Sequence, residues 1–111
     1  MLNHQPPLDR VFHALSDPGR LAIVARLGDG PASVGDLAGP LEMSLPRALQ
    51  HLKVLEDAAL VRSEKKGRTR VCSLAPEGLS AVADWIERRR AAMEARLDRL
   101  GEFLENGGDG S

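Results

Sequence analysis

The spacing of apolar residues constrains this chain most, because it is helical everywhere except in one short stretch. Apolar groups recur at helical intervals from residue 8 to about residue 55, and again over 76–104. Between these regions, 61–65 and 69–74 are short runs with β-branched residues on either side of a Lys-Gly-Arg turn, the pattern of a β-hairpin. With 111 residues the chain can close one core. We therefore expect a single, mainly α domain with a small β-hairpin.

Three residues that suit helix N-caps, Asp17, Ser33 and Ser44, mark where helices begin. Each can accept hydrogen bonds from the free N–H groups of a first turn. Pro18, which follows Asp17, is favourable at the first helical position because it has no N–H to satisfy. The helices expected before the hairpin cover residues 8–15, 18–27, 34–38 and from 45 onward.

A long helix is expected after the hairpin, from residue 76 to about residue 104. Several of its apolar residues are spaced by seven, as in a heptad seam: Leu79, Ile86, Met93 and Leu100, and also Leu97 and Leu104. Such a helix is too long for a core this small to cover, so we expect its far half to pack on a second copy of the chain. The folded domain is then expected to span 8–104, with a disordered lead over 1–7 and a flexible, glycine-rich tail over 105–111.

Positive charge is concentrated in one segment, although the chain as a whole is close to neutral. Residues 44–70 contain seven Lys or Arg and three Asp or Glu, a net charge of +4 in a chain whose total is −1. The helix that follows Ser44 has an apolar stripe, which we expect to be buried: Leu45, Ala48, Leu52 and Leu55. Its opposite side is polar and cationic: Pro46, Arg47, Gln50 and Lys53.

The hairpin carries four further cations: Lys65, Lys66, Arg68 and Arg70. Four cations on one hairpin repel one another, and a polyanionic partner explains why they cluster. A solvated charged face is the alternative interpretation of the same residues.

The order of these elements is that of a winged helix-turn-helix: three helices, a fourth with a cationic side, a basic hairpin and a closing helix. The sequence also resembles the ArsR/SmtB family of bacterial winged-helix transcriptional regulators. Five stretches carry the resemblance: FHALSDPGR (12–20), MSLP (43–46), HLKVLE (51–56), GRTR (67–70) and LAPEGL (74–79). They occur in the family's order and spacing, and together the resemblance covers roughly residues 8–104.

The resemblance implies that the fourth helix lies in the major groove of DNA and that the hairpin, or wing, contacts phosphate or the adjacent minor groove. It also implies a homodimer formed by the first and last helices, which would read a palindrome with half-sites about 34 Å apart. The candidate DNA-binding residues are Ser44, Pro46, Arg47, Gln50, His51, Lys53, Lys65, Lys66, Arg68 and Arg70. The candidate dimer-interface residues are Leu8, Val11, Phe12, Ile86, Met93, Leu97, Leu100 and Leu104.

Side-chain chemistry suggests different roles for the DNA-binding candidates. Arg47 and Gln50 suit base edges, because Arg pairs with guanine and Gln with adenine. Ser44 and Lys53 suit phosphate, whereas the arginines of the wing supply charge and salt dependence. His51 stands where the family commonly has His, and both a structural role and a phosphate contact are open.

The chain departs from the family pattern at several positions. Leu49 and Gln50 stand where members often carry Ser or Thr and Lys or Arg, and Leu49 belongs either to the core or to a contact with a thymine methyl. Gly19 in place of Thr or Ser weakens its helix by up to about 1 kcal/mol. Ala75 in place of a frequent Asp removes a cap of similar size. The departures at 49 and 50 leave the operator sequence open, and those at 19 and 75 do not threaten the fold.

No metal or cofactor site is expected. Family members that sense metals use paired cysteines in the third helix, or His and carboxylates in the last helices. Here 32–37 contains no cysteine and no histidine follows residue 75, while His4, His13 and His51 are scattered without ligand spacing. Cys72 is interpreted as a small buried group, with a redox-sensing thiol as the alternative. Any small-molecule or redox effector is therefore unknown.

Other functional classes fit the sequence less well. No nucleophile motif, phosphate-binding glycine loop or converging acid pair indicates an enzyme, and only three aromatic residues argue against a protein that stacks single-stranded bases. The main alternative is a winged helix used for protein–protein contact, which would expose apolar groups on the fourth helix and the wing.

The apolar runs are too short to span a membrane, so no membrane partner is expected. One cysteine and no visible export signal make the cytoplasm the expected compartment.

We therefore predict a homodimeric regulator that binds double-stranded DNA. That it is a repressor is implied by the resemblance alone.

Overall fold

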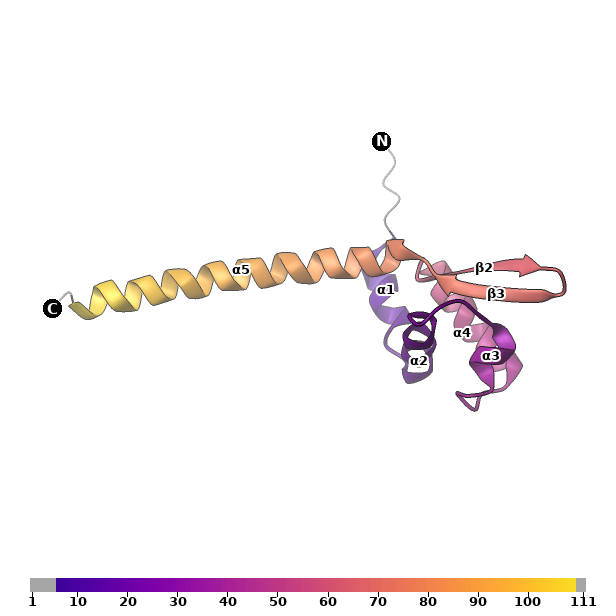
Figure 1. The fold of residues 1–111 in the computed structure, drawn as a ribbon. Helices are drawn as coiled ribbons and strands as arrows, with labels where there is room; N and C mark the ends of the chain where they lie inside the picture. Colours follow the sequence, from indigo (N-terminus) through magenta and orange to yellow (C-terminus); the bar gives the residue numbers. More distant parts are fainter. Residues whose placement is uncertain (1–5, 110–111) are drawn as a thin grey trace, which may run out of the picture.

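The structure, a computed structural model, describes residues 6–109 (Figure 1). Within them the predicted fold class is confirmed: the chain is mainly helical, with one small antiparallel sheet. Its elements are α1 (Leu8–Ala14), α2 (Pro18–Leu27), β1 (Ala32–Ser33), α3 (Val34–Ala38), α4 (Leu45–Asp57), β2 (Val61–Lys66), β3 (Thr69–Leu74) and α5 (Pro76–Asp109). Residues 1–5 of the expected lead and residues 110–111 of the expected tail lie outside the described residues.

The three predicted N-caps are confirmed. A carboxylate oxygen of Asp17 accepts hydrogen bonds from the backbone N–H groups of Gly19 (2.8 Å) and Arg20 (3.1 Å), where α2 begins. The Ser33 and Ser44 hydroxyls accept equivalent bonds, of 3.1 and 3.2 Å, in the first turns of α3 and α4. Because a cap needs only neighbouring residues, this part of the fold is encoded locally.

The sheet has the strand order β1-β3-β2, so it contains one strand more than the predicted hairpin. β2 and β3 pair in register from Val61 opposite Leu74 to Lys66 opposite Thr69, and their turn places Gly67 at a φ of 64°. β1 pairs with the other edge of β3, with Ala32 opposite Cys72. A two-residue strand has no period to detect, so the sequence pattern did not indicate it.

The core lies between the helices and the base of this sheet. Its largest fully buried side chains are Ile23, Leu37, Leu52, Leu55, Leu60, Val11 and Cys72, which come from α1 to α4, β3 and the segment between α4 and β2. This packing holds α4 by its apolar stripe and leaves the opposite side of that helix in solvent.

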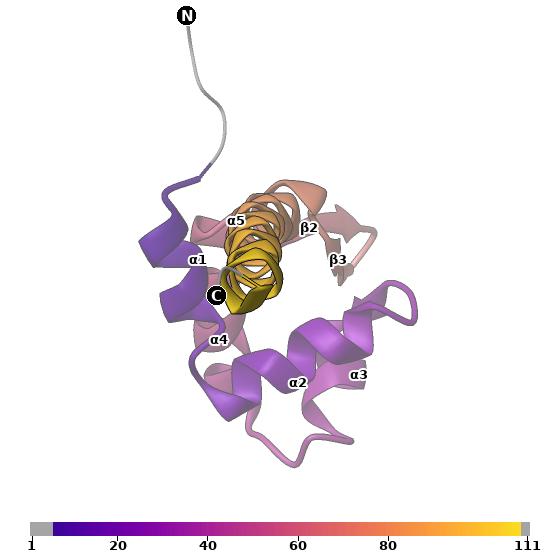
Figure 2. The ribbon, with the colours of Figure 1, turned by 90° about the vertical axis from the view of Figure 1, so that its left-hand side faces the viewer.

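α5 extends away from the rest of the domain (Figure 1). At about 1.5 Å per residue its 34 residues span about 51 Å, and the chain measures 75 × 39 × 21 Å. Over 76–106, where burial is described, only the first two turns of α5 contain buried residues, Gly78 and Ala81. Seen along α5 (Figure 2), α1 lies on one side of it and the β2–β3 hairpin on the other. Most of α5 therefore has no neighbouring element in the part of the chain that the structure describes.

The end of α5 differs from the prediction, since the helix continues from about residue 104 to Asp109. No proline follows Leu104, and two glycines weaken a helix without stopping it. The flexibility predicted for 105–111 stays a prediction. Among residues 6–109, no helix is both long and apolar enough to cross a bilayer.

Candidate nucleic-acid interface

The polar side of α4 lies in solvent, as predicted. Pro46, Arg47, Gln50 and Lys53 are all exposed. Ala48, Leu52 and Leu55 on the opposite side are buried in the core. The side chains suited to base edges and phosphate therefore project outward from a helix that packing holds in place.

Two exposed leucines also lie on α4, and one of them corrects the prediction. Leu45 is 54% exposed, although the helical period placed it in the buried stripe with Ala48 and Leu52. It is the first residue of α4 and lies beyond the edge of the core that covers the stripe further along the helix. Leu49, whose place the sequence left open, is 44% exposed and outside the core cluster. The outward surface of α4 is therefore partly apolar.

His51 is the candidate that the structure moves away from this surface. It is only 8% exposed and faces α2, with its Nε2 3.8 Å from a carboxylate oxygen of Asp17. Its Nδ1 lies 3.4 Å from Nη1 of Arg20, and Arg20 also donates from Nε to the carbonyl oxygen of Ala14 at 2.7 Å. Of the two roles left open by the sequence, burial favours the structural one, because a covered ring cannot reach a phosphate.

Burial also sets the protonation of His51. It lowers the pKa of the imidazole below its ordinary value of 6.5; Asp17 opposes this effect and Arg20 adds to it. Since arginine can only donate, Nδ1 accepts and the neutral ring carries its proton on Nε2. That buried Nε2 has no hydrogen-bond partner among the described residues. A Cβ at Gly19 would lie 3.0 Å from this atom, so the glycine that weakens α2 also makes room for the ring.

The wing brings its four cations together. Lys65, Lys66, Arg68 and Arg70 are all exposed, and the register sets Lys65 directly opposite Arg70. Like charges in this position repel, so this pair lowers the stability of the hairpin unless an anion lies beside it. Arg70 also donates from Nε to the Ser63 hydroxyl at 3.0 Å.

A short chain of hydrogen bonds ties the wing to α4. The Ser63 hydroxyl that accepts from Arg70 donates in turn to a carboxylate oxygen of Glu56 on α4, at 3.4 Å. Between the two elements is an open hollow of about 320 Å³. Its lining residues are Leu49, Leu52, Lys53, Glu56, Asp57 and Arg70. Leu49 and Arg70 of the wing therefore face the same space.

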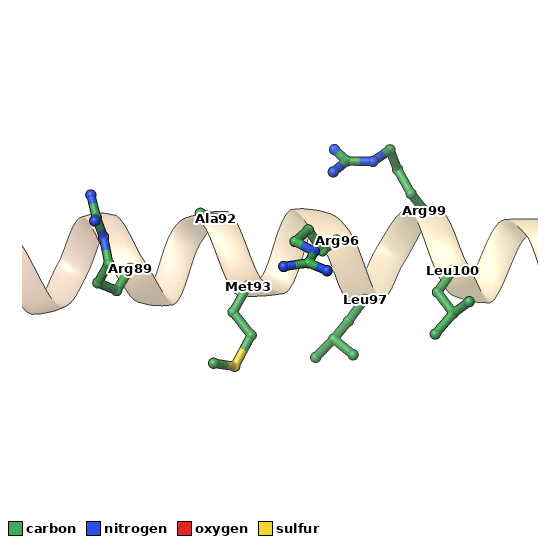
Figure 3. A pocket seen from close by; sticks show the side chains of 7 residues that line it. All are labelled: Arg89, Ala92, Met93, Arg96, Leu97, Arg99 and Leu100. Atoms are coloured by element: carbon green, nitrogen blue, oxygen red, sulfur yellow. The ribbon is translucent and has the colours of Figure 1, made fainter.

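A second exposed surface follows α5 and α1. Ile86, Met93, Leu97, Leu100 and Leu104 are all exposed in the single chain. Figure 3 shows Met93, Leu97 and Leu100 pointing to one side of the helix while Arg99 points to the other. A hollow of about 680 Å³ along this stretch is lined by α5 alone, so no other element among residues 6–109 closes it.

The junction of α1 with α5 accounts for the remaining interface candidates. Phe12 is exposed and packs edge-on against Trp85 with ring centroids 5.6 Å apart, and the Arg89 guanidinium lies 5.3 Å from the Trp85 ring. Leu8 is half-buried. Val11 is fully buried in the core, which corrects its assignment to the interface: a side chain enclosed by its own chain cannot contact a partner.

Sequence reasoning missed one residue of the α5 surface, Phe103. It is 70% exposed and falls on the same helical face as Leu100 and Leu104. Phe103 was not among the predicted interface residues because it is not seven residues from any other apolar residue of the heptad series. Across residues 6–109, no cluster of three or more His, Cys, Asp or Glu side chains could hold a metal ion.

Comparison with known proteins gives consistent matches. Residues 15–64 match the family model described as a helix-turn-helix domain. The chain is 48% identical over 80 residues to the HTH-type transcriptional regulator Rv2034 of Mycobacterium tuberculosis (strain ATCC 25618 / H37Rv), covering 72% of this chain and 75% of that protein. It is 32% identical over 79 residues to the transcriptional repressor SdpR of Bacillus subtilis (strain 168), covering 71% and 88%.

The solved structure of an ArsR-like transcriptional regulator from Rhodococcus sp. RHA1 superposes with a TM-score of 0.74 at 33% identity. The superposition covers 86% of this chain and 91% of that one. These similar proteins are transcriptional regulators rather than enzymes.

Proposed function

Because the chain belongs to the ArsR/SmtB family of winged helix-turn-helix transcriptional regulators, we propose that it binds a palindromic operator in double-stranded DNA as a homodimer and represses transcription there. The observation that carries the proposal is the exposed side of α4, where Arg47, Gln50 and Lys53 project beside a wing with four cations. A helix with such a face fits the major groove, and the wing cations fit the phosphates on either side of it.

The roles follow from position and chemistry. Arg47 and Gln50 contact base edges, because both are exposed near the start of α4, the part of a recognition helix that enters the groove. Ser44 and Lys53 contact phosphate, as do the wing residues Lys65, Lys66, Arg68 and Arg70. His51 supports α4 from beneath and contacts no DNA.

The homodimer rests on the uncovered face of α5. Large apolar side chains there stay in solvent from Ile86 to Leu104, about five turns of helix that no other described part of the chain covers. Exposed apolar surface of this extent marks an interaction site. A second copy supplies a matching face by two-fold symmetry, which also gives the DNA two half-sites about 34 Å apart.

Leu97→Glu tests the dimer. Loss of the leucine's burial costs about 1–2 kcal/mol per chain, and symmetry doubles it, so we expect dimerisation weakened by about 30-fold or more. Ala95→Glu is the matched control, because it places the same carboxylate about 160° around the helix, away from the apolar face. Light scattering over a concentration series should report monomers for Leu97→Glu only. An unchanged mass would remove this face from the interface.

Repression and cellular location follow from the same assignment. A dimer bound over a promoter competes with RNA polymerase, and similarity to the repressor SdpR supports this mode of action. A chromosomal regulator acts in the compartment that contains the chromosome, which is the cytoplasm. The effector that would release the DNA is left open.

The proposal is tested by fluorescence anisotropy with the DNA upstream of the protein's own gene and with a scrambled duplex, at about 150 mM salt. Specific binding should exceed non-specific binding by about 10³ or more. Equal, weak binding to both duplexes, and to any duplex selected from a random pool, would reject the proposal. It would instead favour a winged helix that binds protein, the alternative for which the exposed leucines of α4 provide a surface.

A further inference from the structure

Two leucines on the DNA-facing side of α4 have no part in the contacts assigned above. Leu45 and Leu49 are four residues apart, so they lie one above the other on the helix surface. Among the described residues, the other exposed large apolar side chains belong to α1 or α5, apart from Leu21 on α2. The pair is therefore an apolar patch separate from the α5 surface.

The surroundings of this pair are polar and charged. Leu49 shares the hollow between α4 and the wing with two cations, Lys53 and Arg70, and with two carboxylates, Glu56 and Asp57. Ser44, which precedes Leu45, is exposed. A protein partner that covers the apolar side chains would have to desolvate these charged groups too, whereas an interface with DNA keeps water and offers phosphates to the cations.

The major groove of DNA offers one apolar group, the C5-methyl of thymine, between acceptors and donors that suit Arg and Gln. The two leucines are separated by about 6 Å along the helix axis, and base pairs are stacked about 3.4 Å apart. Leucines with this spacing therefore match methyl groups about two base-pair steps apart on a helix lying in the groove.

We propose that Leu45 and Leu49 read thymine methyl groups, so that each half-site of the operator contains two thymines within about two base-pair steps of each other. This inference rests on the proposed function and deepens it. Leu49 and Gln50, which replace the polar and basic residues common in the family, then form a base-reading set that favours A·T pairs. Arg47 supplies a contact to a neighbouring G·C pair.

The test begins with duplexes selected by the parent protein from a random pool. Each thymine of the selected duplex is then replaced by deoxyuridine, which removes one methyl group and leaves every hydrogen-bonding atom unchanged. We expect about fourfold weaker binding at each of two positions per half-site, corresponding to about 0.8 kcal/mol for one buried methyl-sized group. Uridine elsewhere should change nothing.

Protein variants assign the contacts. Leu49→Ala should bind the thymine and uridine duplexes equally at one of the two positions, and Leu45→Ala at the other. Leu21→Ala is the matched control, because it removes an equally exposed leucine from a different helix and should retain the parent's discrimination. Circular dichroism checks that each variant is folded.

The outcomes separate this inference from the proposed function. A specific duplex that binds equally well with thymine or uridine at every position overturns the inference and leaves the regulator intact. Failure to select any duplex overturns both. The substitution in DNA needs no altered protein, so a variant that does not fold leaves the test decisive. Discrimination that survives in both leucine variants would also overturn the inference, because the methyl contact would then come from another residue.

Discussion

Gly78→Ala should destabilise the protein, although alanine is normally the better helix former. Gly78 lies in the first turn of α5 and donates its backbone N–H to the carbonyl oxygen of Ala59 at 2.8 Å. A Cβ at this position would be 2.8 Å from the same oxygen, 2.9 Å from the carbonyl oxygen of Ala58 and 2.9 Å from Cδ2 of Leu60. Two of these three atoms belong to the backbone and cannot rotate away.

The magnitude follows from three opposing effects. Overpacking costs about 1–3 kcal/mol, a lengthened hydrogen bond to Ala59 costs about 1 kcal/mol, and replacing glycine in a helix gains about 1 kcal/mol. The free energy of unfolding should therefore fall by about 1–3 kcal/mol, which lowers the Tm by about 4 °C or more for a domain of this size.

Gly101→Ala is the matched control, because a Cβ there meets nothing within 4 Å. It should leave stability unchanged or raise it by up to about 1 kcal/mol. Circular dichroism during thermal and urea unfolding measures both variants, at one protein concentration because self-association changes the apparent stability. If Gly78→Ala were as stable as the parent protein, the close approach of α5 to the segment before β2 would not be the constraint described here.

Three further predictions follow from the site and the core. Arg68→Ala should weaken binding to all DNA and reduce the slope of log binding constant against log salt concentration by about 1. Arg47→Ala should cost about 1–3 kcal/mol of binding free energy at one base pair of the operator. If both variants bound DNA like the parent protein, the docking of α4 and the wing on DNA would be contradicted. Burial holds the pKa of His51 below 6.5. Just below pH 6.5 the imidazole is therefore protonated in the unfolded chain but still neutral in the folded protein. Stability should be full above about pH 7 and fall as the pH drops below 6.5 toward the lower pKa, and His51→Gln should flatten this dependence in urea titrations. Burial likewise raises the pKa of the Cys72 thiol, so an aromatic disulfide reagent should modify it only as fast as the protein opens, and rapid modification would restore the redox-sensor interpretation.

The sequence predicted those parts of the fold that depend on near neighbours. Asp17, Ser33 and Ser44 begin helices because a cap satisfies N–H groups two or three residues away, and such spacing is visible in the chain. The hairpin was visible for the same reason, since its turn and its alternating runs are contiguous. β1 was not, because its existence depends on β3, almost forty residues further along the chain.

Burial was predicted less well than secondary structure. The helical period predicts which side of a helix faces the core, but not how far the core extends along that helix. It places Leu45 on the same side as Ala48, but only the packed structure shows that the core ends before reaching it. The same limit applies to His51, whose cover comes from Asp17 and Arg20 on another helix, and to Val11, which is enclosed by its own chain. The candidate site kept its cations, since exposure is the usual state of Lys and Arg.

Because β3 connects directly to α5, the hairpin and α5 are expected to move together if either is rotated. Only Ala75 separates the two elements, and its N–H donates to the carbonyl oxygen of Leu60 at 2.9 Å, so the junction is short and hydrogen-bonded to the segment before β2. The two arms extend in opposite directions, about 51 Å for α5 and about 20 Å for the hairpin (Figure 1). A rigid rotation of about 5° at this joint would displace the far end of α5 by about 4 Å and the tip of the hairpin by about 2 Å. A rotation of α5 about this junction would therefore also move the tip of the hairpin, at the opposite end of the molecule.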